Sequence, residues 1–193
     1  MLEIRKGSPW IFWPSSICDS LPEKPANKFL NGNHSYSIDI TLTLLDDSNI
    51  KKTIFSILPK YTGIDIDKEN ITLLVNQGDN TDAHILPKVI YPYKKTNIIL
   101  KYIYSEKMTL TINGILVKEI SLTKPIGFDE HPHIIFGAGN FPKNGFNLNY
   151  TDIDIHEFKF FVEDELVSHH DFEEFIFDKS VDKTENCNFI HKL

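Results

Sequence analysis

Residues 108–122 read MTLTI-NG-ILVKEISL, and this stretch decides the fold. Apolar residues alternate with threonine before Asn113-Gly114, and a second apolar run follows it. Alternation with a period of two is typical of a strand that buries one face. Asn and Gly both tolerate the positive φ angles of a type I′ turn, which joins two antiparallel strands directly. The stretch therefore predicts a β-hairpin.

Strand patterns recur along most of the chain, with turn residues between them. The 14 Phe, 7 Tyr and 2 Trp also suit pleated sheets better than helices. Only residues 172–177 fit a helix, and a short one. Because no helical crossovers separate the strands, we expect antiparallel sheets. Besides the hairpin, the predicted strands are Tyr36–Leu44, Lys52–Leu58, Ile71–Val75, Ile98–Tyr104, His133–Phe136, Asp152–Val162 and Leu166–Phe172.

Three of these segments resemble concanavalin A-like lectin and glucanase domains, including laminin-G-like modules. The hairpin at 109–117 is similar to an internal hairpin of that family, and residues 133–140 resemble a strand that ends in Gly before a long loop. Residues 151–161 resemble the closing strand. The resemblance covers residues 35–193 and implies an all-β fold, an antiparallel two-sheet jelly-roll sandwich of the concanavalin A-like type.

The first 34 residues lie outside this resemblance. They are rich in Pro, Ser, Asn and Gly and show no sustained periodicity. We therefore expect residues 1–34 to form an irregular N-terminal lead-in packed on the sandwich, with Trp10, Phe12 and Trp13 laid over it.

Charge and hydropathy exclude several classes of partner. The net charge of -7 would repel a phosphate backbone, so nucleic acid is not an expected partner. No stretch approaches the roughly 20 apolar residues of a membrane span. The apolar run between Pro9 and Pro14 is too short for a signal-peptide core. The localisation stays open, because both cytoplasmic synthesis and a place in a virion are compatible with the sequence. A disulfide between Cys18 and Cys187 also stays open.

Two loops supply the residue types that bind sugars. Asp79, Asn80 and Asp82 stand in one, and Asn140 and Phe141 stand in the other. Acids and amides bond to sugar hydroxyls, and an aromatic ring stacks on the sugar. The same residues are also common in ordinary turns. We expect these five residues to be the carbohydrate-binding set.

An acidic strand offers an alternative chemistry. The apolar positions of residues 152–162 switch register near His156 or Glu157, which predicts a β-bulge that brings Glu157 onto the face of Asp152 and Asp154. This arrangement resembles the catalytic strand of laminarinase-type glucanases. That resemblance implies Asp152 as nucleophile, Asp154 as helper and Glu157 as acid/base, although the family has Glu at the first position. A solvated acidic strand face is the competing interpretation.

Metal sites find little support. Alternating oxygen ligands at residues 65–70 leave calcium open, but the segment lacks the glycine of an EF-hand loop and is also typical of an acidic turn. Adjacent strand residues such as His169 and His170 point to opposite faces and cannot easily chelate one ion. No metal site and no required cofactor are predicted.

Tyrosines recur with a period of two, in the pairs Tyr91/Tyr93 and Tyr102/Tyr104. Each pair should share one strand face, where it either stacks on sugar rings or, as we favour, packs against the neighbouring sheet.

Taken together, these features favour a non-catalytic, lectin-like carbohydrate-binding module for attachment on a cell surface or a virion. A structural or protein-interaction sandwich of a larger assembly, such as a phage particle, also fits. A glycoside hydrolase using Asp152 and Glu157 is the third hypothesis. The expected partners are therefore a glycan or other proteins of an assembly.

Overall fold

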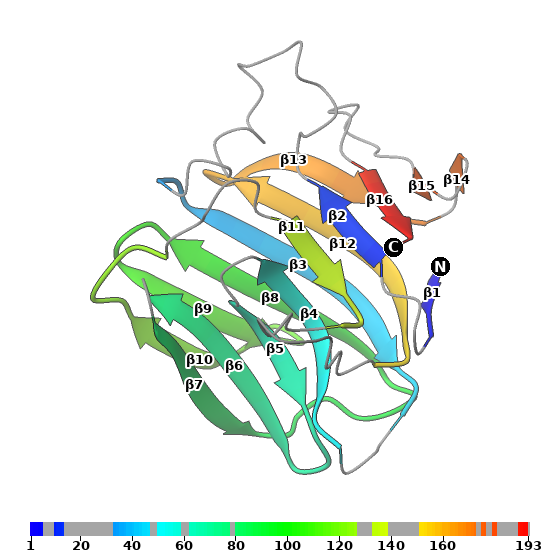
Figure 1. The fold of residues 1–193 in the computed structure, drawn as a ribbon, viewed down its shortest axis with the longest axis horizontal. Helices are drawn as coiled ribbons and strands as arrows, with labels where there is room; N and C mark the ends of the chain where they lie inside the picture. The colour runs from blue at the N-terminus through cyan, green and yellow to red at the C-terminus, as the bar shows by residue number, and fades with distance from the viewer. Residues whose placement is uncertain are drawn as a thin grey trace, which may run out of the picture.

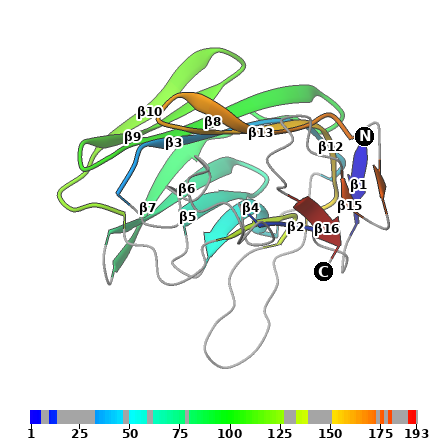
Figure 2. The ribbon, with the colours of Figure 1, turned by 90° about the horizontal axis from the view of Figure 1, so that it is seen from above.

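The computed structural model describes residues 1–5, 10–13, 33–46, 50–58, 62–77, 80–126, 133–138, 151–172, 175–176, 179–180 and 189–192. Every regular element within these ranges is a β-strand, and the strands form two antiparallel sheets (Figure 1). Viewed from above, the sheets lie as two stacked layers (Figure 2). The predicted all-β, two-sheet sandwich of jelly-roll type is confirmed.

The first sheet has seven strands. Their order is β1-β12-β3-β8-β9-β10, and β13 also pairs with β12. The bounds are β1 (Leu2–Ile4), β3 (Tyr36–Leu44), β8 (Lys95–Ile103), β9 (Lys107–Ile112), β10 (Ile115–Ser121), β12 (Ile153–Val162) and β13 (Glu165–His170).

The second sheet has nine strands, in the order β14-β15-β16-β2-β11-β4-β5-β6-β7. The bounds are β2 (Trp10–Trp13), β4 (Lys52–Leu58), β5 (Thr62–Ile66), β6 (Asn70–Gln77), β7 (Asn80–Pro87), β11 (His133–Phe136), β14 (Phe175–Ile176), β15 (Lys179–Ser180) and β16 (Phe189–Lys192).

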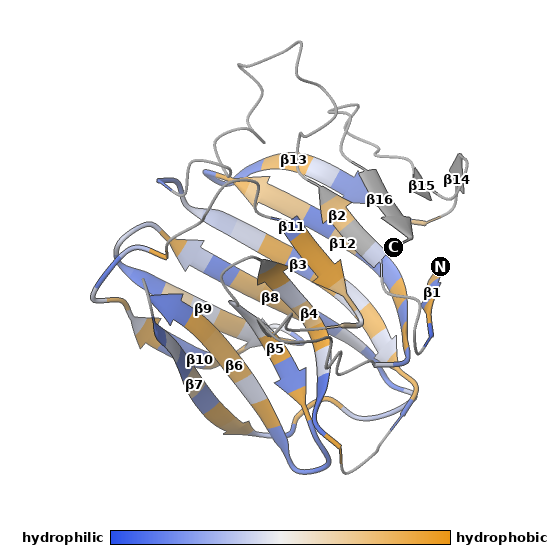
Figure 3. Cartoon of the chain, in the orientation of Figure 1, coloured by the Kyte–Doolittle hydropathy of each residue, from blue (hydrophilic) through white to orange (hydrophobic). Residues whose placement is uncertain are grey.

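The alternating sequence of β3 shows why these layers stack. Its five apolar side chains are buried, and the Ser, Asp and Thr side chains between them stay partly exposed. Figure 3 shows the same alternation of hydropathy on the neighbouring strands. Each strand therefore turns one apolar side toward the other sheet, and burying those sides drives the packing.

Aromatic rings from the two sheets pack against one another in the core. Phe12 from β2 contacts Phe158 and Phe160 of β12, with ring centroids 4.8 and 5.5 Å apart and edge-on geometry. Phe136 from β11 contacts Phe158 at 5.2 Å. Edge-to-face aromatic pairs of this kind stabilise the folded state by more than the burial of their surface area alone would.

The predicted hairpin is confirmed. β9 and β10 pair from Ile112–Ile115 outward, and Asn113 and Gly114 adopt φ angles of 50° and 78°. These are the left-handed values that a type I′ turn requires.

The N-terminal segment differs from the prediction. Residues Leu2–Ile4 pair with β12, and Trp10–Trp13 form a strand between β11 and β16. An irregular lead-in laid over the sandwich is therefore wrong for these two stretches, which belong to the sheets. The apolar run of four residues was too short to show alternation.

Several further strands were missed, among them β5, β7 and β14–β16, and the short helix that residues 172–177 fit is not seen among the described residues. Asp65 and Ile66 of β5 were assigned to an acidic turn and residues 80–82 of β7 to a loop, and the rest of both strands was not assigned. In the segment 172–177, Phe172 has a φ of 56° and residues 175–176 form β14, so the described part is not helical. No helix in the described ranges could cross a bilayer.

Candidate functional site

A polar rim lies at the turn end of the β6–β7 hairpin. We define the hairpin rim as Gln77, Asn80, Asp82 and Thr123. Gln77 Nε2 donates to Asp82 Oδ2 at 3.0 Å. Gln77 Oε1 accepts from the backbone N–H and the hydroxyl of Thr123, at 3.0 and 3.1 Å. Residues from two regions of the chain thus converge on one exposed edge.

The rim includes two of the five residues predicted to bind carbohydrate. Asn80 and Asp82 were expected in a loop, but they lie on β7, opposite Gln77 and Val75. Being two residues apart on a strand, they point to the same side, and both are exposed. Asp79, Asn140 and Phe141 fall outside the described residues, so a joint site with them stays a prediction.

The predicted bulge in the acidic strand is present. The register between β12 and β3 shifts between Ile155 and Glu157, and Asp154, His156 and Glu157 are all partly exposed on the outer side of the sheet. Asp152 precedes the strand, and its backbone carbonyl accepts the N–H of Leu45 at 3.0 Å.

Ion pairs occupy the two carboxylates within this strand. Asp154 accepts Arg5 Nη1 at 2.8 Å, and Glu157 accepts Lys159 Nζ at 2.8 Å and lies 3.0 Å from His169 Nε2. Burial raises the pKa of Glu157, but the hydrogen bonds from Lys159 and His169 outweigh it, so the pKa is lowered overall. A glycosidase general acid needs a raised pKa. The geometry therefore gives no support to the acid/base role of Glu157.

His156 occupies the bulge itself. Its Nε2 is hydrogen-bonded to Thr43 Oγ1 at 2.8 Å. Partial burial lowers the pKa of His156 from its ordinary 6.5, and the charge of Lys95 lowers it further, while Asp154 opposes both. The imidazole is therefore neutral near pH 7 and acts as a hydrogen-bonding group.

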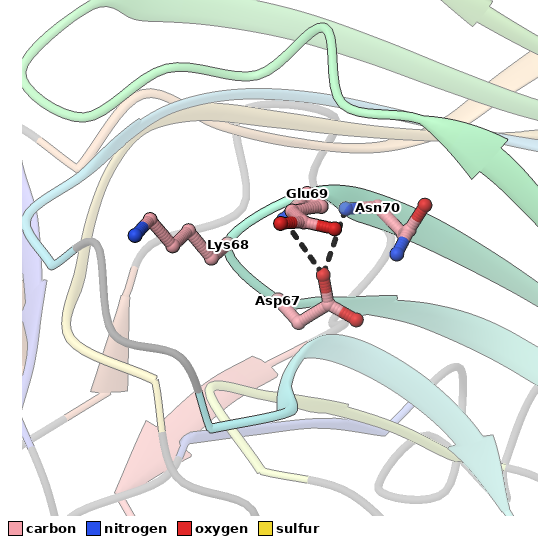
Figure 4. A pocket seen from close by; sticks show the side chains of 4 residues that line it. All are labelled: Asp67, Lys68, Glu69 and Asn70. Carbon is pink, nitrogen blue, oxygen red and sulfur yellow. Dashed lines mark hydrogen bonds between the residues drawn. The ribbon is translucent and has the colours of Figure 1, made fainter.

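The acidic segment 65–70 contains a strand end and a tight turn (Figure 4). Asp67 Oδ1 accepts the N–H groups of Glu69 and Asn70 at 2.8 and 2.7 Å, which lowers the pKa of Asp67. Asp65 lies apart, buried in β5, where it accepts Thr53 Oγ1 at 2.7 Å and Lys51 Nζ at 3.0 Å. A small pocket is lined by residues 67–70, without Asp65. The acidic-turn interpretation fits this geometry better than a calcium site.

The two tyrosine pairs differ in their surroundings. Tyr102 is buried in β8, where its hydroxyl accepts the N–H groups of Ser105 and Ile126. Tyr91 and Tyr93 are not on a strand: they lie in the turn between β7 and β8 and are 57% and 76% exposed. The expected packing against a sheet thus holds for Tyr102 and is wrong for Tyr91 and Tyr93.

Histidines do not cluster around a metal position in the described ranges, where no group of three His, Cys, Asp or Glu side chains could hold an ion. His169 pairs with Glu157 on the outer face, whereas His170 is buried against Phe12 and Phe158. Their opposite orientations agree with the strand geometry. Cys18 and Cys187 lie outside the described residues.

Sequence reasoning missed Gln77 as a rim residue, and it missed Thr123 altogether. Gln77 stands in the polar segment singled out for sugar binding, so its neighbours could have indicated it. Thr123 is 46 residues away, and only the meeting of the two sheet edges brings it to Gln77. No local pattern signals that contact.

Solved structures with the same kind of fold are found. Botulinum neurotoxin type C, whose cell entry depends on interaction with two ganglioside molecules, matches with a TM-score of 0.53 and 17% identity over 70% of this chain. The binding domain of botulinum neurotoxin DC matches in complex with rat synaptotagmin II (TM-score 0.51, 18% identity, 67% of this chain) and with SialylT (0.53, 17%, 72%). These similarities establish a β-sandwich.

The chain spans about one third of those proteins, with 34%, 32% and 34% of their lengths covered. No family model matches the chain, and no curated protein matches it. At these identities the likeness concerns the fold alone.

Proposed function

We propose that this protein is a non-catalytic, lectin-like carbohydrate-binding module with a concanavalin A-like sandwich, used for attachment on a cell surface or a virion. The observation that carries the proposal is the hairpin rim, where an amide, a carboxylate and a hydroxyl meet in an exposed position. These three groups are the types that sugar hydroxyls bond to.

The rim keeps hydrogen-bonding capacity for a ligand. Gln77 engages Asp82 Oδ2, so the other carboxylate oxygen of Asp82 is open to a sugar hydroxyl. The exposed amide of Asn80 supplies two further donors and an acceptor. Because Thr123 orients Gln77 and Gln77 holds Asp82, a ligand meets groups that are already oriented, which lowers the entropic cost of binding.

The structural neighbours support a binding role over an enzymatic one. The neurotoxin type C interacts with gangliosides, and the binding domain of neurotoxin DC was solved with synaptotagmin and with SialylT. This chain spans only about one third of the length of those proteins. For this chain their ligands therefore suggest only a class of ligand, either a glycan or a protein.

A glycan array with the whole chain tests the proposal, run with and without calcium. We expect binding to at least one glycan, weakened tenfold or more by Asp82→Ala or Asn80→Ala. Asp164→Ala is the matched control, because this exposed acid pairs with Lys101 and not with a rim residue. Absence of binding to every glycan by the parent protein would contradict the proposal.

A second function remains supported by one observation: an apolar edge on β10. Ile115 and Leu116 are 69% and 57% exposed, which is unusual for adjacent apolar side chains and suits contact with a protein of a larger assembly, such as a phage particle. If the glycan array is negative and Leu116→Ser abolishes incorporation into such an assembly, the structural role is the better one.

A further inference from the structure

β7 forms an open edge of the nine-stranded sheet. It pairs with β6 in an unbroken register from Asn70–Pro87 to Gln77–Asn80, without a bulge. Along its eight residues, only Leu86 is buried, and Ile85 is 69% exposed. In the described part of the chain no strand lies on its other side. Such a strand presents every second N–H and C=O to an incoming strand.

The other sheet edges in the described ranges carry features that discourage pairing. β10 has a bulge between Leu116 and Lys118, and charged residues follow it. β14 has two residues and β1 has three, too short to pair extensively. β13 pairs with β12 through a register shift. β7 has none of these features: it is long and regular, contains no Lys or Arg, and has Pro87 only at its end.

We propose that β7 pairs antiparallel with β7 of a second copy of this chain, which joins the two nine-stranded sheets into one. A register centred on Ala83 keeps core-facing residues on the same side of both sheets. It places Thr81 opposite Ile85 and Asp82 opposite His84 of the other copy.

Self-pairing fits the composition of β7 better than pairing with an unrelated peptide. Asp82 is the only acid of the strand, and in this register it never faces its own copy, so no like charges meet. A Thr–Ile pair and an Asp–His pair are both favourable across strands. The interface is the same patch on both copies, which is how a closed two-fold dimer forms.

The arrangement would also make glycan binding bivalent. The two Asn80 residues would lie six residues apart along the paired strands, roughly 20 Å. Both rims would face the same side of the joined sheet. A ligand with several sugars could then engage both copies at once and gain avidity without new contacts.

Disulfide trapping tests the register directly. In a chain with Cys18 and Cys187 replaced by serine, Ala83→Cys would face its own copy at a Cα distance of about 4.5–5.5 Å, within reach of a disulfide. We expect mild oxidation to give a covalent dimer. Ile85→Cys is the control, because it would face Thr81 of the other copy and should form no disulfide. Equal cross-linking of both variants, or of neither, would overturn the proposed register.

Sedimentation across a wide range of concentrations tests the dimer without cysteines. Ile85→Lys should raise the dissociation constant at least tenfold. Ile115→Lys on the β10 edge should not, although this residue has the same 69% exposure. A parent chain that is monomeric at every concentration, or a dimer weakened equally by both variants, would refute the proposal. Neither substituted residue belongs to the hairpin rim, so glycan binding by monomeric Ile85→Lys can be scored separately.

Discussion

Two glycines adopt the same left-handed backbone in different surroundings. Gly114 in the hairpin turn has a φ of 78° and open space around the position of a Cβ atom. Gly137, at the end of β11, has a φ of 73°, but a Cβ there would lie 2.3 Å from Ile4 Cγ2 and 3.3 Å from Thr151 O. Backbone strain and steric overlap can therefore be separated in one protein.

Gly137→Ala should destabilise the fold more than Gly114→Ala. The left-handed conformation alone costs an alanine about 1–2 kcal/mol, which both variants incur. At Gly137 the overlap with Ile4 should add about 1–3 kcal/mol. Urea unfolding of both variants measures the difference, and equal losses would show that Ile4 moves aside without cost.

His156 should make stability depend on pH. Its pKa is lowered in the folded protein by burial and by Lys95 and the Met1 amino group, against the opposing charge of Asp154. The unfolded chain therefore binds this proton more tightly, so the contribution of His156 to stability is full above pH 6.5 and falls as the pH drops below it.

Replacing His156 with Gln tests this dependence. The variant should lose less stability than the parent between pH 7.5 and pH 5, as measured by urea unfolding, because it has no imidazole to protonate. A steeper loss in His156→Gln than in the parent would contradict the lowered pKa.

At the scale of elements, strands that bury one side were the easiest to predict. β3, β9 and β12 alternate apolar and polar residues, and the switch of phase in β12 even located its bulge. β5 is buried at every residue and contains Gly63, so it shows no alternation. β7 is mostly exposed and polar, like a loop. Alternation appears in a sequence only when a strand buries one face. β5 has two buried faces and β7 has almost none, so neither strand alternates.

β1 depends on an ion pair as well as on its short register. Arg5 follows the strand and donates to Asp154 at 2.8 Å and to the carbonyl of Ile153 at 3.3 Å. Asp154→Ala should speed hydrogen exchange of the β1 amides by a few-fold to about tenfold. Glu157→Ala removes a neighbouring ion-paired acid that does not touch Arg5, and it should leave β1 unchanged. Equal protection of β1 in Asp154→Ala and the parent would contradict the role of Arg5.

At the scale of the whole molecule, the first residues are part of the core. Phe12 is fully buried and contacts both aromatic rings of β12. Phe12→Ala should cost about 3–5 kcal/mol, whereas Ile85→Ala, on the exposed edge, should cost little. A chain starting at residue 35 should not fold cooperatively by circular dichroism and calorimetry. If it does fold cooperatively, residues 35–193 form a stable domain without β1 and β2, contrary to this expectation.

The candidate site was predictable only where its residues are close in sequence. Asn80 and Asp82 followed from residue type, but their place on a strand and their contact with Thr123 through Gln77 did not. Contacts between segments 46 residues apart depend on how two sheet edges meet. A single sequence carries no local signal for such a meeting.

The pairing of β2 with β16 has a consequence for biosynthesis. Residues 10–13 leave the ribosome long before their partners at residues 189–192. β2 can pair with β11 earlier, but its second pairing has to wait until residues 189–192 have been translated. Such distant pairing also slows the search for the native state. Newly made chains should consequently benefit from chaperones until β16 has formed.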